Sequence, residues 1–360
     1  MDLRILLPFL ASLLSFVFAI MVGDQWLRRR QPFQLVWTIG LIFYGIGAGT
    51  DFLASAYGWS EPLYRTWYLF GAFGVAAYLG LGTIFLLNRT RFGYFVAFSL
   101  LFGGVISLLF ALARLKEGQH IPTWGIVAVV GACVLGAVVL AIATRINRRL
   151  VAPLTAAGLV IASLVALALV IGAPVAAPGF ATNAQTGAPV GDAFPAYLRM
   201  LTPPFNITGA FALVFGAIYS AYIFMPKRRV LRVTSTLPVI GPLGRGLAVI
   251  VNFVASIPGA ARALAAGQLN SRVPATLLIA LGGFIPGWTS GLTRLGFTWA
   301  YFLGELLGVL FIFLGFLVSI EVFSDVRLPF THVVLSRRRV EPGAGQLRES
   351  EVVDSPSRSA

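Results

Sequence analysis

Two acidic side chains inside long apolar runs are the residues of this chain most able to carry chemistry. Asp51 lies near the end of the second apolar run, and Glu305 lies about two turns inside the last one. An ionisable group inside a bilayer needs a partner or a water-filled cavity, and such groups often mark ion or substrate pathways. The sequence predicts an outward-facing polar pocket in which Arg65 could meet Asp51 and Arg294 could pair with Glu305. The alternative is a set of salt bridges at the rim that fix helix ends.

A further group of polar residues opens the seventh apolar run, where the sequence reads Thr-Pro-Pro-Phe-Asn-Ile-Thr from residue 202. Thr202 can cap a helix that begins at Pro203, because proline is well suited to the first helical position. Asn206 and Thr208 would then direct polar groups into the bundle. Helix capping and ligand contact are the two interpretations for this segment, and both residues are included in the predicted pocket.

Small residues recur four apart in three of the apolar runs, and this spacing clears one helix face for close helix contact. Pro286 lies inside the eighth run, where it removes a backbone hydrogen bond and can kink the helix. One interpretation is helix packing, and the other is a narrow path or a moving interface. The glycines concerned are Gly45, Gly49, Gly283, Gly287, Gly291, Gly304 and Gly308.

Several chemistries lack the residues that they need. The two lysines, Lys116 and Lys227, both fall between apolar runs, so a retinal Schiff base is not expected. The single cysteine, Cys133, permits neither an intrachain disulfide nor a cysteine metal site. The two histidines, His120 and His332, are expected on opposite sides of the membrane. There is also no phosphate-binding loop and no nucleophile elbow. We therefore expect no catalytic residue, no metal and no cofactor.

The elements that must position these residues are membrane-spanning helices. The chain is 58% hydrophobic and only 11% charged, whereas soluble domains carry about a quarter charged residues. About 20 apolar residues cross the hydrocarbon core. The sequence therefore predicts an all-α, polytopic transmembrane helical bundle of about nine spans, at residues 3–22, 33–54, 63–87, 92–113, 123–143, 154–172, 203–225, 273–292 and 298–323.

The segment 233–272 separates a seven-span region, 1–232, from two further spans in 273–323. Its apolar core, 246–257, is too short to span, and a longer span from residue 237 would place Arg245 inside the membrane. We expect an interfacial or re-entrant segment there, followed by a separate short surface helix from Pro258. The spanning interpretation of 237–257 is the alternative. The charged tail, 324–360, is expected to be disordered.

The basic residues orient the bundle. With the N-terminus outside and the C-terminus in the cytoplasm, the cytoplasmic side holds 21 of the 27 lysines and arginines. This is the positive-inside pattern of a cell (inner or plasma) membrane protein, and it explains the net charge of +14 without a nucleic-acid partner. The expected partners are the lipid bilayer and proteins at the cytoplasmic face.

Four short segments resemble parts of a group of uncharacterised bacterial multi-pass membrane proteins. They are Val36–Leu41, Tyr78–Thr83, Thr202–Asn206 and Thr289–Arg294. The resemblance covers most of the spans, and 233–272 looks like an addition to that pattern. A looser likeness to seven-helix receptor modules fails because two more spans follow and the tail holds no signalling domain. The resemblance implies an architecture and no catalytic residue.

The sequence leaves three functions open. The glycine-lined helices, Pro286 and the outer polar residues favour a permease or channel-like protein for a small or lipid-like solute. The odd number of spans, the absence of an internal repeat and the basic inner loops are typical of a membrane sensor or scaffold subunit of a complex. A lipid-modifying membrane enzyme, with the outer acids as general acid and base, is the third.

Overall fold

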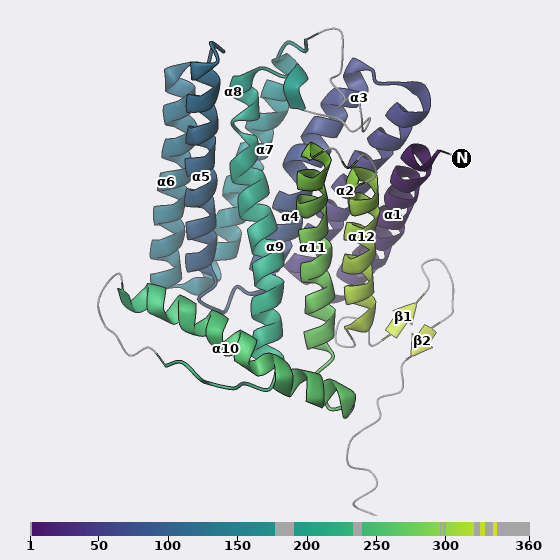
Figure 1. The fold of residues 1–360 in the computed structure, drawn as a ribbon, viewed down its shortest axis with the longest axis vertical. Helices are drawn as coiled ribbons and strands as arrows, with labels where there is room; N and C mark the ends of the chain where they lie inside the picture. Colours follow the sequence, from purple (N-terminus) through teal and green to yellow (C-terminus); the bar gives the residue numbers. More distant parts are fainter. Residues whose placement is uncertain are drawn as a thin grey trace, which may run out of the picture.

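The computed structural model is a helical bundle (Figure 1). It describes residues 2–176, 191–232, 240–295, 297, 300–319, 325–327 and 334–336. Ten of its helical segments are long and apolar enough to cross a membrane. The only β-structure in these described ranges is an antiparallel pair of short strands, β1 (Asp325–Arg327) and β2 (Val334–Ser336). The prediction of disorder elsewhere in 324–360 falls on residues outside the described ranges.

The long helices match the predicted apolar runs closely. A π-helical segment, η1 (Trp67–Gly74), joins α3 (Glu61–Thr66) to α4 (Val75–Leu86), so these three elements form one continuous helix. Two 3₁₀ turns, η2 (Arg148–Leu150) and η3 (Gly191–Ala193), and the short α8 (Ala196–Arg199) complete the helical elements. The other helices are α1 (Leu3–Arg29), α2 (Pro32–Tyr57), α5 (Gly93–Lys116), α6 (Thr123–Ile146), α7 (Val151–Gly172), α9 (Thr202–Phe224), α10 (Ile240–Ala265), α11 (Arg272–Arg294) and α12 (Ala300–Val318).

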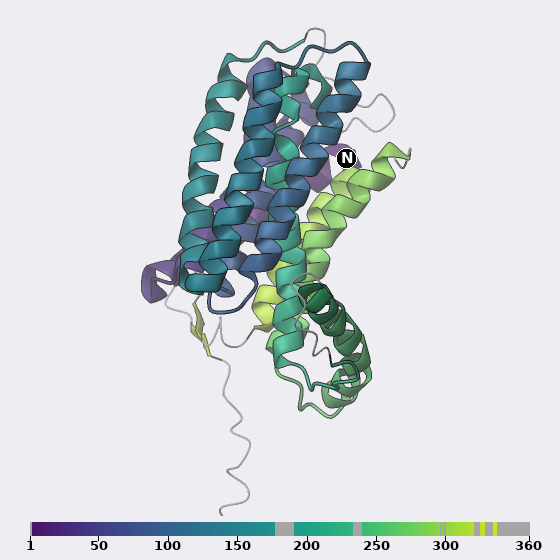
Figure 2. The ribbon, with the colours of Figure 1, turned by 90° about the vertical axis from the view of Figure 1, so that its left-hand side faces the viewer.

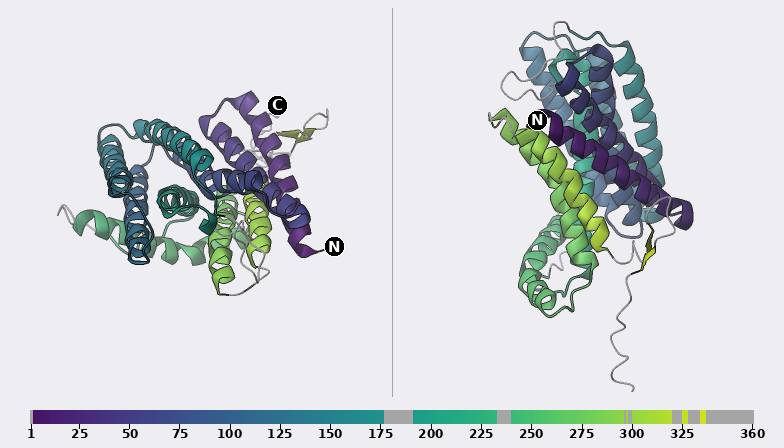
Figure 3. Two further views of the ribbon diagram at one scale, coloured as in Figure 1. Left: turned by 90° about the horizontal axis from the view of Figure 1, so that it is seen from above. Right: turned by 90° about the vertical axis from the view of Figure 1, so that its right-hand side faces the viewer.

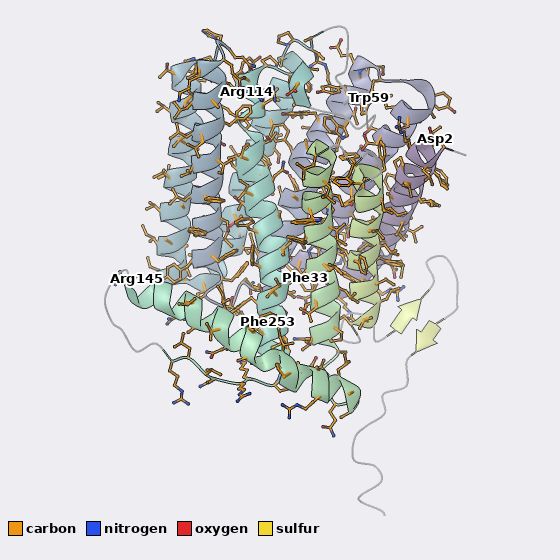
Figure 4. All side chains as sticks on the ribbon, in the orientation of Figure 1. Asp2, Phe33, Trp59, Arg114, Arg145 and Phe253 are labelled. Carbon is orange, nitrogen blue, oxygen red and sulfur yellow. The ribbon has the colours of Figure 1, made fainter. Side chains whose placement is uncertain are left out.

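The helix α10 differs from the others in direction. It lies across one end of the bundle, while the other long helices run between the two ends (Figures 1 and 2). Figure 4 places Arg145 and Phe253 at this end and Trp59 and Arg114 at the opposite end. The predicted break at Pro258 is wrong, because α10 continues through that proline to Ala265. A proline removes only one backbone hydrogen bond, and the helix is held before it by Asn252 and Ser256 and beyond it by the buried Ala260, which packs in one cluster with Ala221 of α9.

The main core is formed by α1, α2, α4, α9, α11 and α12. Trp37 of α2 lies near its centre, where its indole packs edge-on against Phe316 and its Nε1–H donates a hydrogen bond to the Leu79 carbonyl at 3.0 Å. This bond matters because a buried indole N–H without an acceptor would destabilise the core. The bundle therefore has a packed interior around α2, with α5, α6 and α7 to one side of it (Figure 3).

Most of the predicted small-residue positions lie at close helix contacts. Gly45 and Gly49 of α2 face Phe16 and Ser12 of α1, and the Ser12 hydroxyl donates to the Gly45 carbonyl at 2.8 Å. Gly283 of α11 meets α9, while Gly304 and Gly308 of α12 meet α11. Gly287 and Gly291 are different, because an added Cβ would meet nothing within 4 Å at either position. Five of the seven glycines thus lie where another helix comes close, whereas Gly287 and Gly291 do not.

Candidate functional site: a buried acid pair

Asp51 and Glu305 come together in the interior of the bundle. Asp51, on α2, is 1% exposed and interacts electrostatically with Glu305 of α12. Its Oδ2 accepts a hydrogen bond from the Tyr301 hydroxyl at 3.3 Å. Asp51 Oδ1 and Glu305 Oε2 are both buried and have no hydrogen-bond partner among the described residues. The two carboxyl groups are thus buried with fewer donors than their oxygens can accept.

Helical spacing explains why these groups converge. Tyr44 and Asp51 are seven residues apart on α2, and Tyr301 and Glu305 are four apart on α12, so each pair shares one helix face. The Tyr44 hydroxyl donates to the backbone carbonyl of Glu305 at 2.6 Å, which ties the two helices together at this depth. The two faces therefore place four polar side chains at one junction.

A third element completes the junction. Trp67, at the start of η1, makes a side-chain hydrogen bond with Tyr301. Because an indole can only donate, the chain of donors runs from Trp67 to Tyr301 and from Tyr301 to Asp51. The π-helical segment that carries Trp67 is a rare conformation, and such segments are frequent at functional sites. The first donor of the chain that leads to Asp51 therefore lies on a locally irregular helix.

The pocket predicted from the sequence is only partly assembled. Arg65 does not pair with Asp51: its guanidinium binds Glu61 and the α7 carbonyls of Val170 and Ile171, as well as the carbonyl of Ala173. The prediction failed because sequence spacing does not show that the end of α7 lies beside α3. The side chain of Arg294, the other predicted cation, lies outside the described residues.

The two polar residues of α9 lie apart from the described contacts of the acids. Asn206 and Thr208 are both half-buried, and Thr208 Oγ1 has no hydrogen-bond partner among the described residues. Their helix packs mainly against α4, α5 and α11 rather than α2 or α12. Thr202, the expected cap, instead donates from its hydroxyl to the Arg199 carbonyl at 2.9 Å. Ligand contact by Asn206 and Thr208 stays a prediction.

The role of Arg65 gives a stability prediction. Replacing Arg65 with methionine should lower the free energy of unfolding by about 2–3 kcal/mol, because it leaves several carbonyls at the end of α7 without their charged donor. Replacing Arg28, whose exposed pair with Asp24 is a single helix-surface contact, should cost at most about 0.5 kcal/mol. Thermal denaturation of the two purified variants in detergent compares them. Equal losses would contradict the role assigned to Arg65.

Tyr44, Trp67 and Tyr301 were missed by sequence reasoning. Each is an aromatic residue within an apolar run, where packing explains it without any polar role. Tyr301 had one available signal, because it stands one turn before Glu305 and so must share its face. No such signal existed for Trp67, since nothing local in the sequence places it next to α12.

The described residues contain no group of three or more His, Cys, Asp or Glu side chains that could hold a metal ion. Comparison with known proteins adds no assignment, because no family model, curated protein or solved structure matches this chain. By the length and composition of its helices, the apolar bundle is compatible with a multi-pass membrane protein. Any functional conclusion therefore rests on the geometry of the acid pair.

Proposed function

We propose that this chain is a nine-span inner or plasma membrane permease in which Asp51 and Glu305 share a proton that is exchanged during transport of a small or lipid-like solute. In this arrangement the N-terminus is outside, the C-terminus is cytoplasmic and α10 lies at the cytoplasmic interface. The direction of α10 across the bundle end supports that placement, as does the bias of basic residues toward the same end. The resemblance to bacterial multi-pass proteins is compatible with it.

The observation that carries the proposal is the pair of buried carboxyl oxygens without partners. A single ionised carboxylate is costly in a low-dielectric interior, and two at close range oppose each other. No lysine or arginine among the described residues forms an ion pair with either acid. One proton held between the two groups would remove this conflict. Acids arranged in this way within a membrane are typical of proton relays in transporters.

Infrared difference spectroscopy tests the shared proton directly. Spectra of the purified protein are recorded from acidic to alkaline buffer. The carbonyl stretch of a protonated carboxylic acid should still be present at neutral pH and should be lost only in alkaline buffer. That band should shift in frequency in either Asp51→Asn or Glu305→Gln, because the remaining acid stays buried but loses its carboxyl partner, and it should disappear in the double variant. Asp24→Asn is the matched control, since Asp24 lies at a surface salt bridge, and it should leave the band unchanged. A band that is unchanged in both single variants, or that survives the double variant, would overturn the proposal.

The alternatives predict a different result. A sensor or scaffold subunit would use the acids only to hold α2 against α12, so Asn and Gln would keep the fold and change no proton uptake. A lipid-modifying enzyme would need the acids to contact a lipid, whereas Asp51 is almost completely buried. Release and rebinding of this proton when a transported solute is added would therefore separate the permease from both.

A further inference from the structure

The helix α10 has two unlike sides. Large apolar side chains occupy one side and are well exposed: Leu247 by 57%, Ile250 by 62%, Val254 by 57% and Ile257 by 46%. Their spacing of three, four and three residues keeps them on one helix face. Asn252 and Ser256, which are buried, are four apart on another face. An exposed apolar stripe of this kind does not suit contact with water.

The polar side of α10 holds an extended basic segment. We call residues 226–232 the basic strap. The Asn252 side chain accepts from the backbone N–H groups of Val230 and Leu231 and donates to the Leu231 carbonyl, all at 2.8–2.9 Å. Ser256 Oγ accepts from the Arg228 N–H at 2.9 Å. These bonds satisfy the backbone of a segment that has no secondary structure of its own, and they fix it along α10.

The basic strap presents an unbalanced positive charge. Its four cations, Lys227, Arg228, Arg229 and Arg232, are all exposed, and no ion pair is described for any of them. Moreover, the chain contains no aspartate or glutamate between Asp192 and Glu305. No acid of α9, α10 or α11 can therefore neutralise the basic strap. Figure 4 shows long nitrogen-tipped side chains pointing away from the bundle below α10.

We propose that α10 and the basic strap form a binding site for anionic phospholipid. The apolar stripe lies at the boundary of the acyl chains, and the four cations of the basic strap bind headgroup phosphates. This inference rests on the proposed membrane placement, in which α10 is interfacial. A helix with an apolar face and a basic polar side is suited to this position, and cations near a membrane surface favour anionic lipid. Packing of Phe253 against Tyr222 joins this unit to the end of α9.

Short-range fluorescence quenching tests the proposal in the full chain. Cys133 is the only cysteine, so a Cys133→Ala, Ile250→Cys protein can carry one bimane label on the apolar stripe. The labelled protein is reconstituted in phosphatidylcholine vesicles that contain a small fraction of nitroxide-labelled phosphatidylglycerol or phosphatidylcholine. Quenching by the anionic lipid should exceed quenching by the zwitterionic lipid about threefold or more at low salt. High salt should reduce this ratio.

Variants identify the source of the preference. Changing the four cations of the basic strap to glutamine should bring the ratio to about one. The matched control changes four exposed arginines of other loops at the same end to glutamine, and it should keep the ratio: Arg89, Arg91, Arg148 and Arg149. Asn252→Ala, which releases the basic strap from α10, should lower the ratio while the label stays quenched by both lipids.

Four results would overturn the inference. A ratio near one both in the native chain and after neutralisation of the acids of the tail, or a ratio that survives loss of the four cations, would show no anionic site. A native ratio near one that rises when Glu341, Glu349, Glu351 and Asp354 become glutamine would assign the basic strap to the chain's own tail. Absence of quenching by either lipid would show that α10 is not interfacial. That last result would contradict the proposed membrane placement of α10. It would not bear on the shared proton at Asp51 and Glu305, which the infrared measurement tests separately.

Discussion

Replacing Gly308 with leucine is expected to prevent α11 and α12 from packing and to lower the free energy of unfolding by about 3 kcal/mol or more. A Cβ at this position would lie 2.6 Å from Cγ of Pro286 and 3.0 Å from the Tyr44 hydroxyl oxygen. Neither neighbour can move easily, because the proline ring is part of α11 and the tyrosine is held by its bond to the Glu305 carbonyl. Leucine would therefore separate α12 from both α11 and α2.

The chain contains a matched control for this change. Gly287 is the residue next to Pro286, but it faces open space, so Gly287→Leu should change stability by no more than about 0.5 kcal/mol. Heating each variant in detergent and measuring the folded fraction by size-exclusion chromatography gives the comparison. Similar melting temperatures for the two leucine variants would contradict the close contact between α11 and α12.

Alkaline conditions are expected to destabilise the native chain, and loss of both acids should remove this sensitivity. In the unfolded chain both carboxyl groups ionise at ordinary acidic pH, whereas the proposed pair keeps one proton in the folded state. The folded state then binds more protons, so the free energy of unfolding falls as pH rises, by about 1.4 kcal/mol per pH unit for one retained proton. The loss stops once the pair itself ionises.

Melting temperatures across a pH series measure this effect. Replacing both acids with amides should flatten the curve, because no group is left to hold the proton, whereas Glu305→Gln alone leaves Asp51 buried and should keep part of the pH dependence. Tyr301→Phe should keep the pH dependence while lowering stability, since it removes only the donor to Asp51. A native curve that is flat, or one that rises with pH, would exclude a shared proton.

The positions of the helices were largely predictable from the sequence, because a bilayer imposes a long apolar run on each spanning segment. Predicted and observed ends differ by only a few residues for most of them, as at 123–143 against α6 (Thr123–Ile146). Around Pro258 the prediction was less successful. The sequence indicated a non-spanning segment there, because the apolar core is short and a longer span would include Arg245, whereas length and composition alone count Gly246–Ala265 as long enough to cross.

Of the residues at the candidate site, only the two acids could be predicted from the sequence. Burial of charge in an apolar segment is visible in a sequence, and it singled out Asp51 and Glu305. The neighbours of each acid depend on which helices meet, and residues 250 positions apart carry no local sign of contact, as Tyr301 and Asp51 show. Arg65 was assigned to the pocket for the same reason, since its carbonyl partners on α7 are more than 100 residues away.

The π-helical segment η1 changes the direction in which side chains point along the helix that contains it. Each of its backbone bonds spans one residue more than a bond in an α-helix, so everything after η1 is rotated about the axis relative to everything before it. The first half of this span can therefore direct Trp67 toward α12, while its second half directs Gly80 against Gly209 of α9. The two halves of this continuous helix thus turn their contact faces in different directions. One half contacts α12 and the other contacts α9, without a break in the helix.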